Sequence, residues 1–142
     1  MGWEKVDGQN YAGRQDTVRF AVAKNNRAQH RICAYVFIGR NVCKKLGWTK
    51  DTRLDAYWGT GKNEGSIRLE EAMKGRYVLR CDTGRETNSR SLYIGVSYLP
   101  SWASKQVHGR DVAVHVALDK MLDVTCPAWF VGKKLRVVEK AA

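Results

Sequence analysis

The sequence has no long apolar run, and this absence excludes a membrane-spanning helix. Its longest uncharged stretch, residues 91–104, has 14 residues and contains Pro100 and four serines, whereas a spanning helix needs about 20 mainly apolar residues. The first residues, Met1-Gly2-Trp3-Glu4-Lys5, also lack the apolar segment of a secretory signal. We therefore expect a cytoplasmic protein that does not engage membranes. For a phage-encoded chain this means the host cytoplasm, with packaging into a virion as a further option.

Cysteine spacings typical of metal and redox sites are missing as well. None of the four cysteines lies in a Cys-x-x-Cys pair: Cys33, Cys43, Cys81 and Cys126. We interpret them as structural free thiols, with disulfides and a metal site as the alternatives. His108 and His115 are candidate partners for a cysteine nucleophile, but no spacing brings them to one. The sequence therefore predicts no enzyme, no cofactor and no metal.

One glycine-rich stretch resembles part of a phosphate-binding loop but lacks its defining positions. Gly59-Thr60-Gly61-Lys62 is followed by Asn63 where that loop has Ser or Thr, and Ala56 stands where its first glycine belongs. The stretch also lies between predicted strands, whereas a phosphate-binding loop precedes a helix. We interpret it as a hairpin loop, and no small-molecule substrate is indicated.

Acidic residues are absent from a long interval in the first half of the chain. Between Asp16 and Asp51 there is no Asp or Glu. The same interval holds eight basic residues: Arg19, Lys24, Arg27, Arg31, Arg40, Lys44, Lys45 and Lys50. With 25 basic and 14 acidic residues, the chain carries a net charge of +11, which attracts polyanions and supplies affinity for phosphates. A solvated surface is the alternative, but the one-sided distribution favours nucleic acid.

Alternating apolar residues predict a mainly β protein. Residues 17–24 are expected to form one strand and residues 30–38 a second, which is apolar on both faces and therefore buried. A short helix is predicted after Gly39, and Gly47 ends it, because a helix C-terminus favours a residue that tolerates positive φ. Residues 1–16 show no period and are interpreted as an N-terminal arm.

A second hairpin follows the predicted helix. Leu54, Ala56 and Trp58 share one face of its first strand, and residues 66–70 form its return strand. Trp48 and Trp58 are expected in the core. Trp3 and Trp102 are the candidates for exposed contacts, and Trp102 is a candidate for stacking on a nucleic-acid base.

The second half of the chain repeats this order of elements. The corresponding segments are 76–81 and 91–99 for the first two strands, 100–107 for the helix, and 112–118 and 121–126 for the closing hairpin. Residues 100–107 align with 39–46 without a gap, and Pro100 suits the start of a helix. The sequence therefore predicts two half-repeats, each with a short helix.

The stretch from Ile38 to Trp58 resembles the core of the AbrB/MazE/SpoVT swapped-hairpin family. Members of that family carry a strand, a proline or glycine, a short basic helix ending in Leu-Gly-[Ile/Trp], an acidic turn and a strand, as Leu46-Gly47-Trp48 and its neighbours do here. The resemblance implies an AbrB-like swapped-hairpin β-barrel with two short helices. Its tandem ββαββ half-repeats, residues 17–70 and 76–138, would form a single-chain pseudo-dimer. Leu-Gly-Trp is absent from the second half.

In DNA-binding members of that family, basic residues on the first hairpin and beside the short helix contact DNA. Carried over by position, the resemblance implies nucleic-acid-binding residues as follows: Lys24, Arg27, Arg31, Arg40, Lys44, Lys45, Arg80, Arg85, Arg90, Lys105 and Arg110. We expect these cationic hairpins and helices on one common side of the barrel. Gln106 stands where Lys45 would repeat, and Glu86 interrupts the second basic run, so the first half is expected to dominate.

Composition, pattern and resemblance together favour a non-enzymatic nucleic-acid-binding protein. Its expected partner is duplex DNA, and its expected role is that of a transcriptional regulator or DNA-organising protein. The alternative is a structural or interaction module, such as a phage virion component, that self-associates or docks a protein partner. Such a module would keep the barrel without the DNA role, because a fold does not fix a function.

Overall fold

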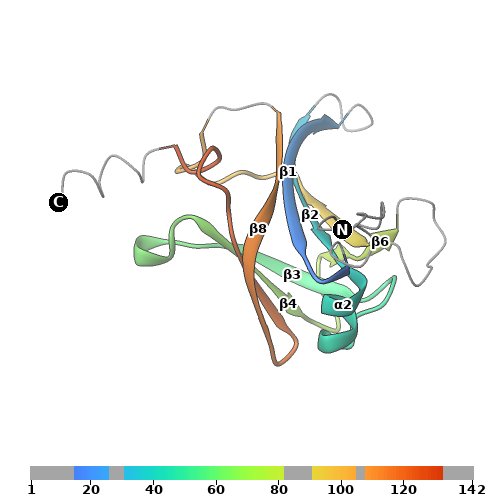
Figure 1. The fold of residues 1–142 in the computed structure, drawn as a ribbon. Helices are drawn as coiled ribbons and strands as arrows, with labels where there is room; N and C mark the ends of the chain where they lie inside the picture. Colours follow the sequence, from blue (N-terminus) through green and yellow to red (C-terminus); the bar gives the residue numbers. More distant parts are fainter. Residues whose placement is uncertain (1–14, 26–30, 82–90, 105–107, 133–142) are drawn as a thin grey trace, which may run out of the picture.

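The computed structural model describes residues 15–25, 31–81, 91–104 and 108–132. They form one nine-stranded antiparallel sheet in the order β5-β3-β4-β9-β8-β1-β2-β7-β6 (Figure 1). Its two outermost strands, β5 Tyr77–Val78 and β6 Arg80–Cys81, are separated in the chain by Leu79 alone. The two ends of the sheet therefore meet, and the sheet curls into a nearly closed β-barrel.

The other strands and the first helix follow the order predicted from the sequence, while the strand predicted over 76–81 is divided into β5 and β6. The remaining strands are β1 Val18–Asn25, β2 Arg31–Ile38, β3 Arg53–Trp58, β4 Ser66–Glu71, β7 Leu92–Val96, β8 Gly109–Leu118 and β9 Met121–Thr125. Helix α2 covers Arg40–Leu46, and the 3-10 helix η2 covers Gly61–Asn63. The prediction of a mainly β chain is confirmed. In the described parts of the chain, no helix is long and apolar enough to cross a membrane.

The strand pairings fall into two matching sets. The hairpin β1–β2 pairs with β8 and β7, and the hairpin β3–β4 pairs with β5 and β9. The first half contains two antiparallel pairs, β1–β2 and β3–β4, and the second half contains two corresponding pairs, β6–β7 and β8–β9. Within the described residues, each hairpin of the first half is thus flanked by strands of the second half.

The prediction of a second helix over residues 100–107 is wrong for residues 100–104, the part that the structure describes. Residues 100–104 form a turn in which the Ala103 N–H donates to the Pro100 carbonyl at 3.1 Å, while 105–107 lie outside the described residues. The Ser104 N–H then donates to the carbonyl of Phe130 at 2.6 Å, and its hydroxyl donates to that of Trp129 at 2.8 Å. These bonds tie the backbone of Ser104 to a distant segment, and residues 100–104 form no helix.

An aromatic cluster fills part of the core. Phe130 is fully buried, and its ring centroid lies 4.7 Å from that of Phe20, 5.7 Å from Trp58 and 5.8 Å from Trp102. Trp102 is only 7% exposed, and its Nε1 donates to the Gly59 carbonyl at 2.9 Å. Its predicted exposure and base stacking are therefore wrong, because packing against Phe130 and Trp58 covers the ring.

Burial of the other tryptophans follows the prediction where the structure describes them. Trp48 is 1% exposed, and Trp58 packs against the core. Leu54 and Ala56 lie on the same inward face of β3 as Trp58. Trp3 lies outside the described residues.

Helix α2 ends where the sequence predicted. Gly47 has φ 75°, and the Trp48 N–H donates to the Cys43 carbonyl at 2.9 Å, which closes the last helical turn. The buried residues Val42, Cys43 and Leu46 face the barrel, whereas Lys44 and Lys45 are exposed. The helix lies at the end of the barrel where β1 begins, since the Gly39 N–H donates to the Thr17 carbonyl at 2.9 Å (Figure 1).

Replacing Gly47 with alanine should lower the free energy of unfolding by about 1–2 kcal/mol, because an L side chain is strained at this positive φ. The added Cβ would also lie 2.8 Å from the Lys120 Nζ, which has to move. Urea unfolding followed by circular dichroism measures the change. Lys45→Ala, on the exposed side of the same helix, is the control and should change stability by less than about 0.5 kcal/mol. Equal unfolding midpoints for Gly47→Ala and the parent would contradict the prediction.

Candidate nucleic-acid interface

Two rows of side chains lie next to each other on the outer surface of the barrel. Across β6, β7, β2 and β1 the paired residues of the first row are Arg80, Tyr93, Phe37 and Arg19. Across β7, β2, β1 and β8 the paired residues of the second row are Gly95, Tyr35, Ala21 and Arg110. Directly paired residues of antiparallel strands project from the same face of a sheet. Neither row contains an acidic residue.

These rows face outward because their neighbours along each strand face the core. Phe20, Val36 and Ile94 alternate with the rows and are at most 1% exposed. We call the six large side chains of the two rows the arginine–aromatic face: Arg19, Tyr35, Phe37, Arg80, Tyr93 and Arg110. It draws on five strands from both halves of the sequence, namely β1, β2, β6, β7 and β8.

Phe37 lies at the centre of the arginine–aromatic face. Its ring centroid is 5.4 Å from that of Tyr93 and 6.3 Å from that of Tyr35. The Cζ atoms of Arg19 and Arg110 lie 5.3 and 5.6 Å from the same centroid, which is the range of cation–π attraction. The three rings are only half-buried, so both aromatic surface and positive charge are offered to solvent.

A recess of about 390 Å³ opens beside these rings. It is lined by two small residues, Ala21 and Ala23, and by four large ones, Tyr35, Phe37, Tyr93 and Arg110. Its volume falls within the roughly 300–1,000 Å³ of small-ligand sites. Tyr35 lies across Gly95, where an added Cβ would be 2.8 Å from its ring. The glycine thus lets this ring lie flat against the sheet.

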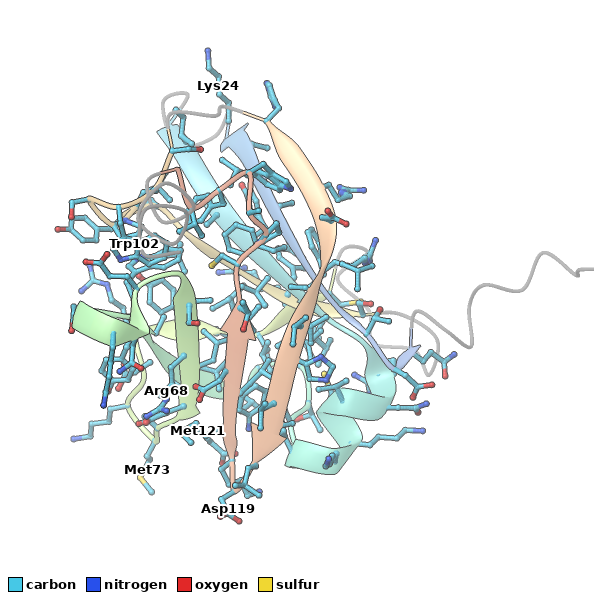
Figure 2. The ribbon with its side chains drawn as sticks, turned by 60° about the vertical axis from the view of Figure 1, so that its left-hand side comes forward. Lys24, Arg68, Met73, Trp102, Asp119 and Met121 are labelled. Atoms are coloured by element: carbon cyan, nitrogen blue, oxygen red, sulfur yellow. The ribbon has the colours of Figure 1, made fainter. Side chains whose placement is uncertain are left out.

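The structure places two of the residues predicted to bind nucleic acid on the arginine–aromatic face, namely Arg80 and Arg110. Lys44 and Lys45 are exposed on α2, and Lys24 is exposed near the end of β1. The β1–β2 register separates Lys24 from α2 by almost the whole length of β1, and the two lie at opposite ends of the barrel (Figure 2). The expectation of one common side is therefore wrong for these three lysines.

The prediction that Arg40 binds nucleic acid is contradicted by its burial. This residue is 6% exposed, so its guanidinium is not presented to a phosphate backbone. Its position explains the burial, because Arg40 lies three residues before Cys43 and shares the inward side of α2 with it. Five further predicted side chains are not described by the structure: Arg27, Arg31, Arg85, Arg90 and Lys105.

Sequence reasoning missed the aromatic half of this face. Tyr35 and Phe37 belong to the strand interpreted as buried on both faces, and Tyr93 to its counterpart in the second half. Their alternation with Val36 and Ile38 was the available signal, because it puts the aromatic residues on one face and the aliphatic residues on the other. Arg19 was recognised only as part of the basic interval.

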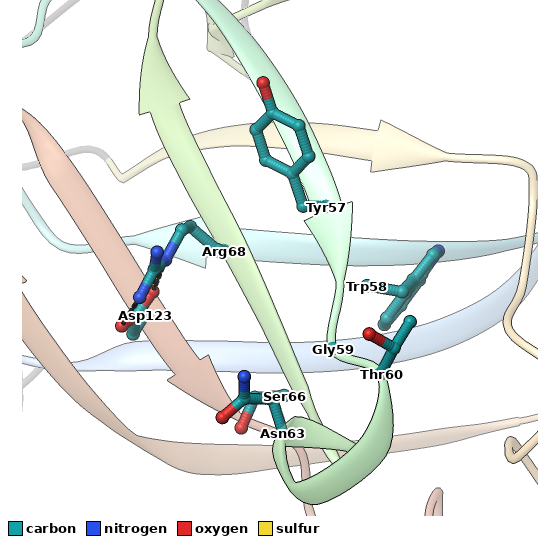
Figure 3. A pocket seen from close by; sticks show the side chains of 8 residues that line it. All are labelled: Tyr57, Trp58, Gly59, Thr60, Asn63, Ser66, Arg68 and Asp123. Atoms are coloured by element: carbon teal, nitrogen blue, oxygen red, sulfur yellow. Dashed lines mark hydrogen bonds and ion pairs between the residues drawn. The ribbon is translucent and has the colours of Figure 1, made fainter.

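A smaller pocket of about 230 Å³ lies on the β3–β4 hairpin (Figure 3). Arg68 in its wall donates two hydrogen bonds to Asp123, from Nε to Oδ1 at 2.7 Å and from Nη2 to Oδ2 at 2.9 Å. The hydrogen bond to Asp123 and the carboxylate charge raise the pKa of Arg68 above its usual value. Because Asp123 neutralises the only arginine of this pocket, the pocket is a poor anion site. The stretch 59–65 is a hairpin loop, as predicted.

All four cysteines are free and buried. Burial raises the pKa of the Cys126 thiol to about 12. Among the described residues, no group of three or more His, Cys, Asp or Glu side chains is arranged to hold a metal ion.

The four thiols should react slowly with a disulfide reagent such as DTNB at about pH 8 while the protein is folded. Reaction requires an accessible thiolate, and burial of all four side chains removes that access. Unfolding in guanidinium chloride should release four thiols per chain, measured by absorbance. A fast stoichiometric reaction in the native protein would contradict the burial of at least one cysteine.

Comparisons of this chain with protein-family models, with curated proteins and with solved structures give no match in any of the three. The resemblance to the AbrB/MazE/SpoVT family therefore remains a hypothesis from the sequence.

Proposed function

We propose that this protein binds nucleic acid through its arginine–aromatic face and performs no catalysis on it. The observation that carries the proposal is the gathering of three arginines and three aromatic rings in two paired rows that contain no acidic residue. Arginine donates hydrogen bonds to phosphate in a fixed planar geometry, and its charge persists at any physiological pH. The net charge of +11 supports the same partner by attracting polyanions over a longer range.

The fold proposed for this function is an AbrB-like, internally duplicated swapped-hairpin barrel. It is supported by the two matching sets of strand pairings, in which hairpin β1–β2 pairs with β7 and β8, and hairpin β3–β4 with β5 and β9. Interlocked hairpins of this kind are what the resemblance implies for a single-chain pseudo-dimer. The same resemblance favours duplex DNA, and a role as transcriptional regulator or DNA-organising protein.

Removing the three arginine charges should weaken binding to nucleic acid by about 10-fold or more at low salt. The variant carries Arg19→Gln, Arg80→Gln and Arg110→Gln. Fluorescence anisotropy with labelled duplex and single-stranded DNA, at about 50 and about 200 mM salt, measures affinity and its salt dependence. Loss of three phosphate contacts should reduce the slope of log affinity against log salt by about 2–3.

The matched control removes three predicted basic residues away from that face, by Lys24→Gln, Lys44→Gln and Lys45→Gln. This variant has the same net charge as the arginine variant, so the two differ only in the position of the charges that they lose. Its affinity should fall by less than about threefold, through the weaker long-range field. A larger loss in the control than in the arginine variant would move the site to the hairpin and α2, and no binding by the parent protein would overturn the proposed function.

A second candidate function, a structural or interaction module, is favoured by an exposed apolar stripe on β8. Val112, Val114, Val116 and Leu118 alternate along the strand predicted over 112–118. They are 58–73% exposed, while Ala113 and Ala117 face the core. Exposed patches of this kind mark protein contacts. Sedimentation velocity over a range of concentrations separates the candidates. A chain that binds no nucleic acid but assembles, and that loses assembly with Val114→Thr and Val116→Thr, is such a module.

A further inference from the structure

We infer that the arginine–aromatic face accepts unpaired nucleotides, whose bases stack on its rings, so that the protein prefers single-stranded nucleic acid to a duplex. The inference rests on the proposed nucleic-acid binding and names the form of nucleic acid that this face takes. The inferred partner therefore differs from the duplex DNA that the sequence analysis favoured.

The first reason is the half-exposed aromatic rings. Contacts to a duplex backbone require only cations and hydrogen-bond donors, since paired bases are stacked on one another and their flat faces are covered. Unpaired bases expose those faces, and proteins that bind them present aromatic side chains and arginine planes for stacking. Three half-exposed rings lie on two neighbouring strands, β2 and β7. They suit stacking of unpaired bases and add nothing to contacts with a duplex backbone.

The second reason is the order of side chains across the barrel. The first row runs from Arg80 through Tyr93 and Phe37 to Arg19 on four neighbouring strands. With strands about 4.8 Å apart, this row is about 14 Å long. A nucleic-acid strand that crosses the β-strands therefore meets a cation, two rings and a second cation, which suits its own alternation of phosphates and bases.

The third reason is the recess beside the rings. Its lining includes Ala21 and Ala23, whose short side chains leave space next to Tyr35 and Phe37. Arg110 also lines the recess and lies over Phe37, at 5.6 Å from the ring centroid. A base that enters the recess stacks against a ring, while Arg110 remains near enough to contact the adjoining phosphate.

The guanidinium groups of Arg19 and Arg110 lie over the ring of Phe37, and this cation–π contact orders them. Such ordering reduces the conformational entropy that binding would otherwise cost. A protein partner would also find rings here, but three arginines without an acidic residue in either row favour a polyanion. The arrangement therefore points to an unpaired nucleic-acid strand as the occupant.

The test compares a labelled oligo(dT) strand, an oligo(U) strand and a DNA duplex of equal length, by anisotropy at fixed salt. The parent should bind the single strands more tightly than the duplex. Phe37→Leu with Tyr93→Leu keeps the apolar contacts and removes the stacking planes. It should lose about 10-fold or more in affinity for the single strands and less than about threefold for the duplex.

Two further variants separate stacking from loss of structure. Ala23→Leu narrows the recess without removing a ring or a charge, and it should weaken single-strand binding by several-fold. Phe37→Trp restores a flat ring and should bind single strands as well as the parent. Tyr57→Leu is the matched control, because Tyr57 is an aromatic residue on β3, 49% exposed, outside both rows. It should leave all affinities unchanged, and thermal melting confirms that each variant is folded.

One outcome would overturn the inference and leave the proposed function in place. Duplex affinity equal to or above that for single strands, with no effect of Phe37→Leu, Tyr93→Leu and Ala23→Leu, would leave a nucleic-acid-binding protein that does not stack bases. Binding to none of the three probes would remove the proposed function itself. Loss of self-association in the ring variant, without any nucleic-acid binding, would assign this face to a protein contact.

Discussion

The antiparallel pairing of β2 with β7 is the contact on which both the core and the arginine–aromatic face depend. Its register places Phe37 beside Tyr93 on the outside and Val36 beside Ile94 in the core. A slip of one residue would exchange the two faces, because side chains alternate along a strand. The burial of aliphatic residues on one side of this pairing therefore holds the aromatic residues in place on the other.

Closure of the barrel depends on a second, smaller set of bonds. The Asp51 N–H donates to the Leu79 carbonyl at 2.9 Å, and the Leu79 N–H donates to the Thr52 carbonyl at 2.9 Å. These bonds tie the turn after α2 to the junction of β5 and β6, where the two ends of the sheet meet. Closure leaves few exposed strand edges, which reduces the risk of pairing with other chains.

Position, more than the number of charges, separates the basic residues of this chain. Arg19 and Arg40 belong to the same acid-free interval, yet Arg19 lies over the half-buried ring of Phe37, whereas Arg40 is buried on the inward side of α2. Arg80 and Arg110 come from the second half of the sequence and share a face with Arg19. The composition predicted a polyanionic partner, whereas strand register decides which arginines share a face.

Local pattern was enough to predict the mainly β character, the end of α2 at Gly47 and the hairpin loop at 59–65. Each of these depends on side-chain alternation or on the backbone preference of a few consecutive residues. Tertiary structure alone decided the burial of Trp102, the turn in place of a second helix, and the gathering of Phe37, Tyr93 and the arginines. These features depend on contacts between segments far apart in the chain, and a strand that is apolar on both faces does not reveal which face will be covered.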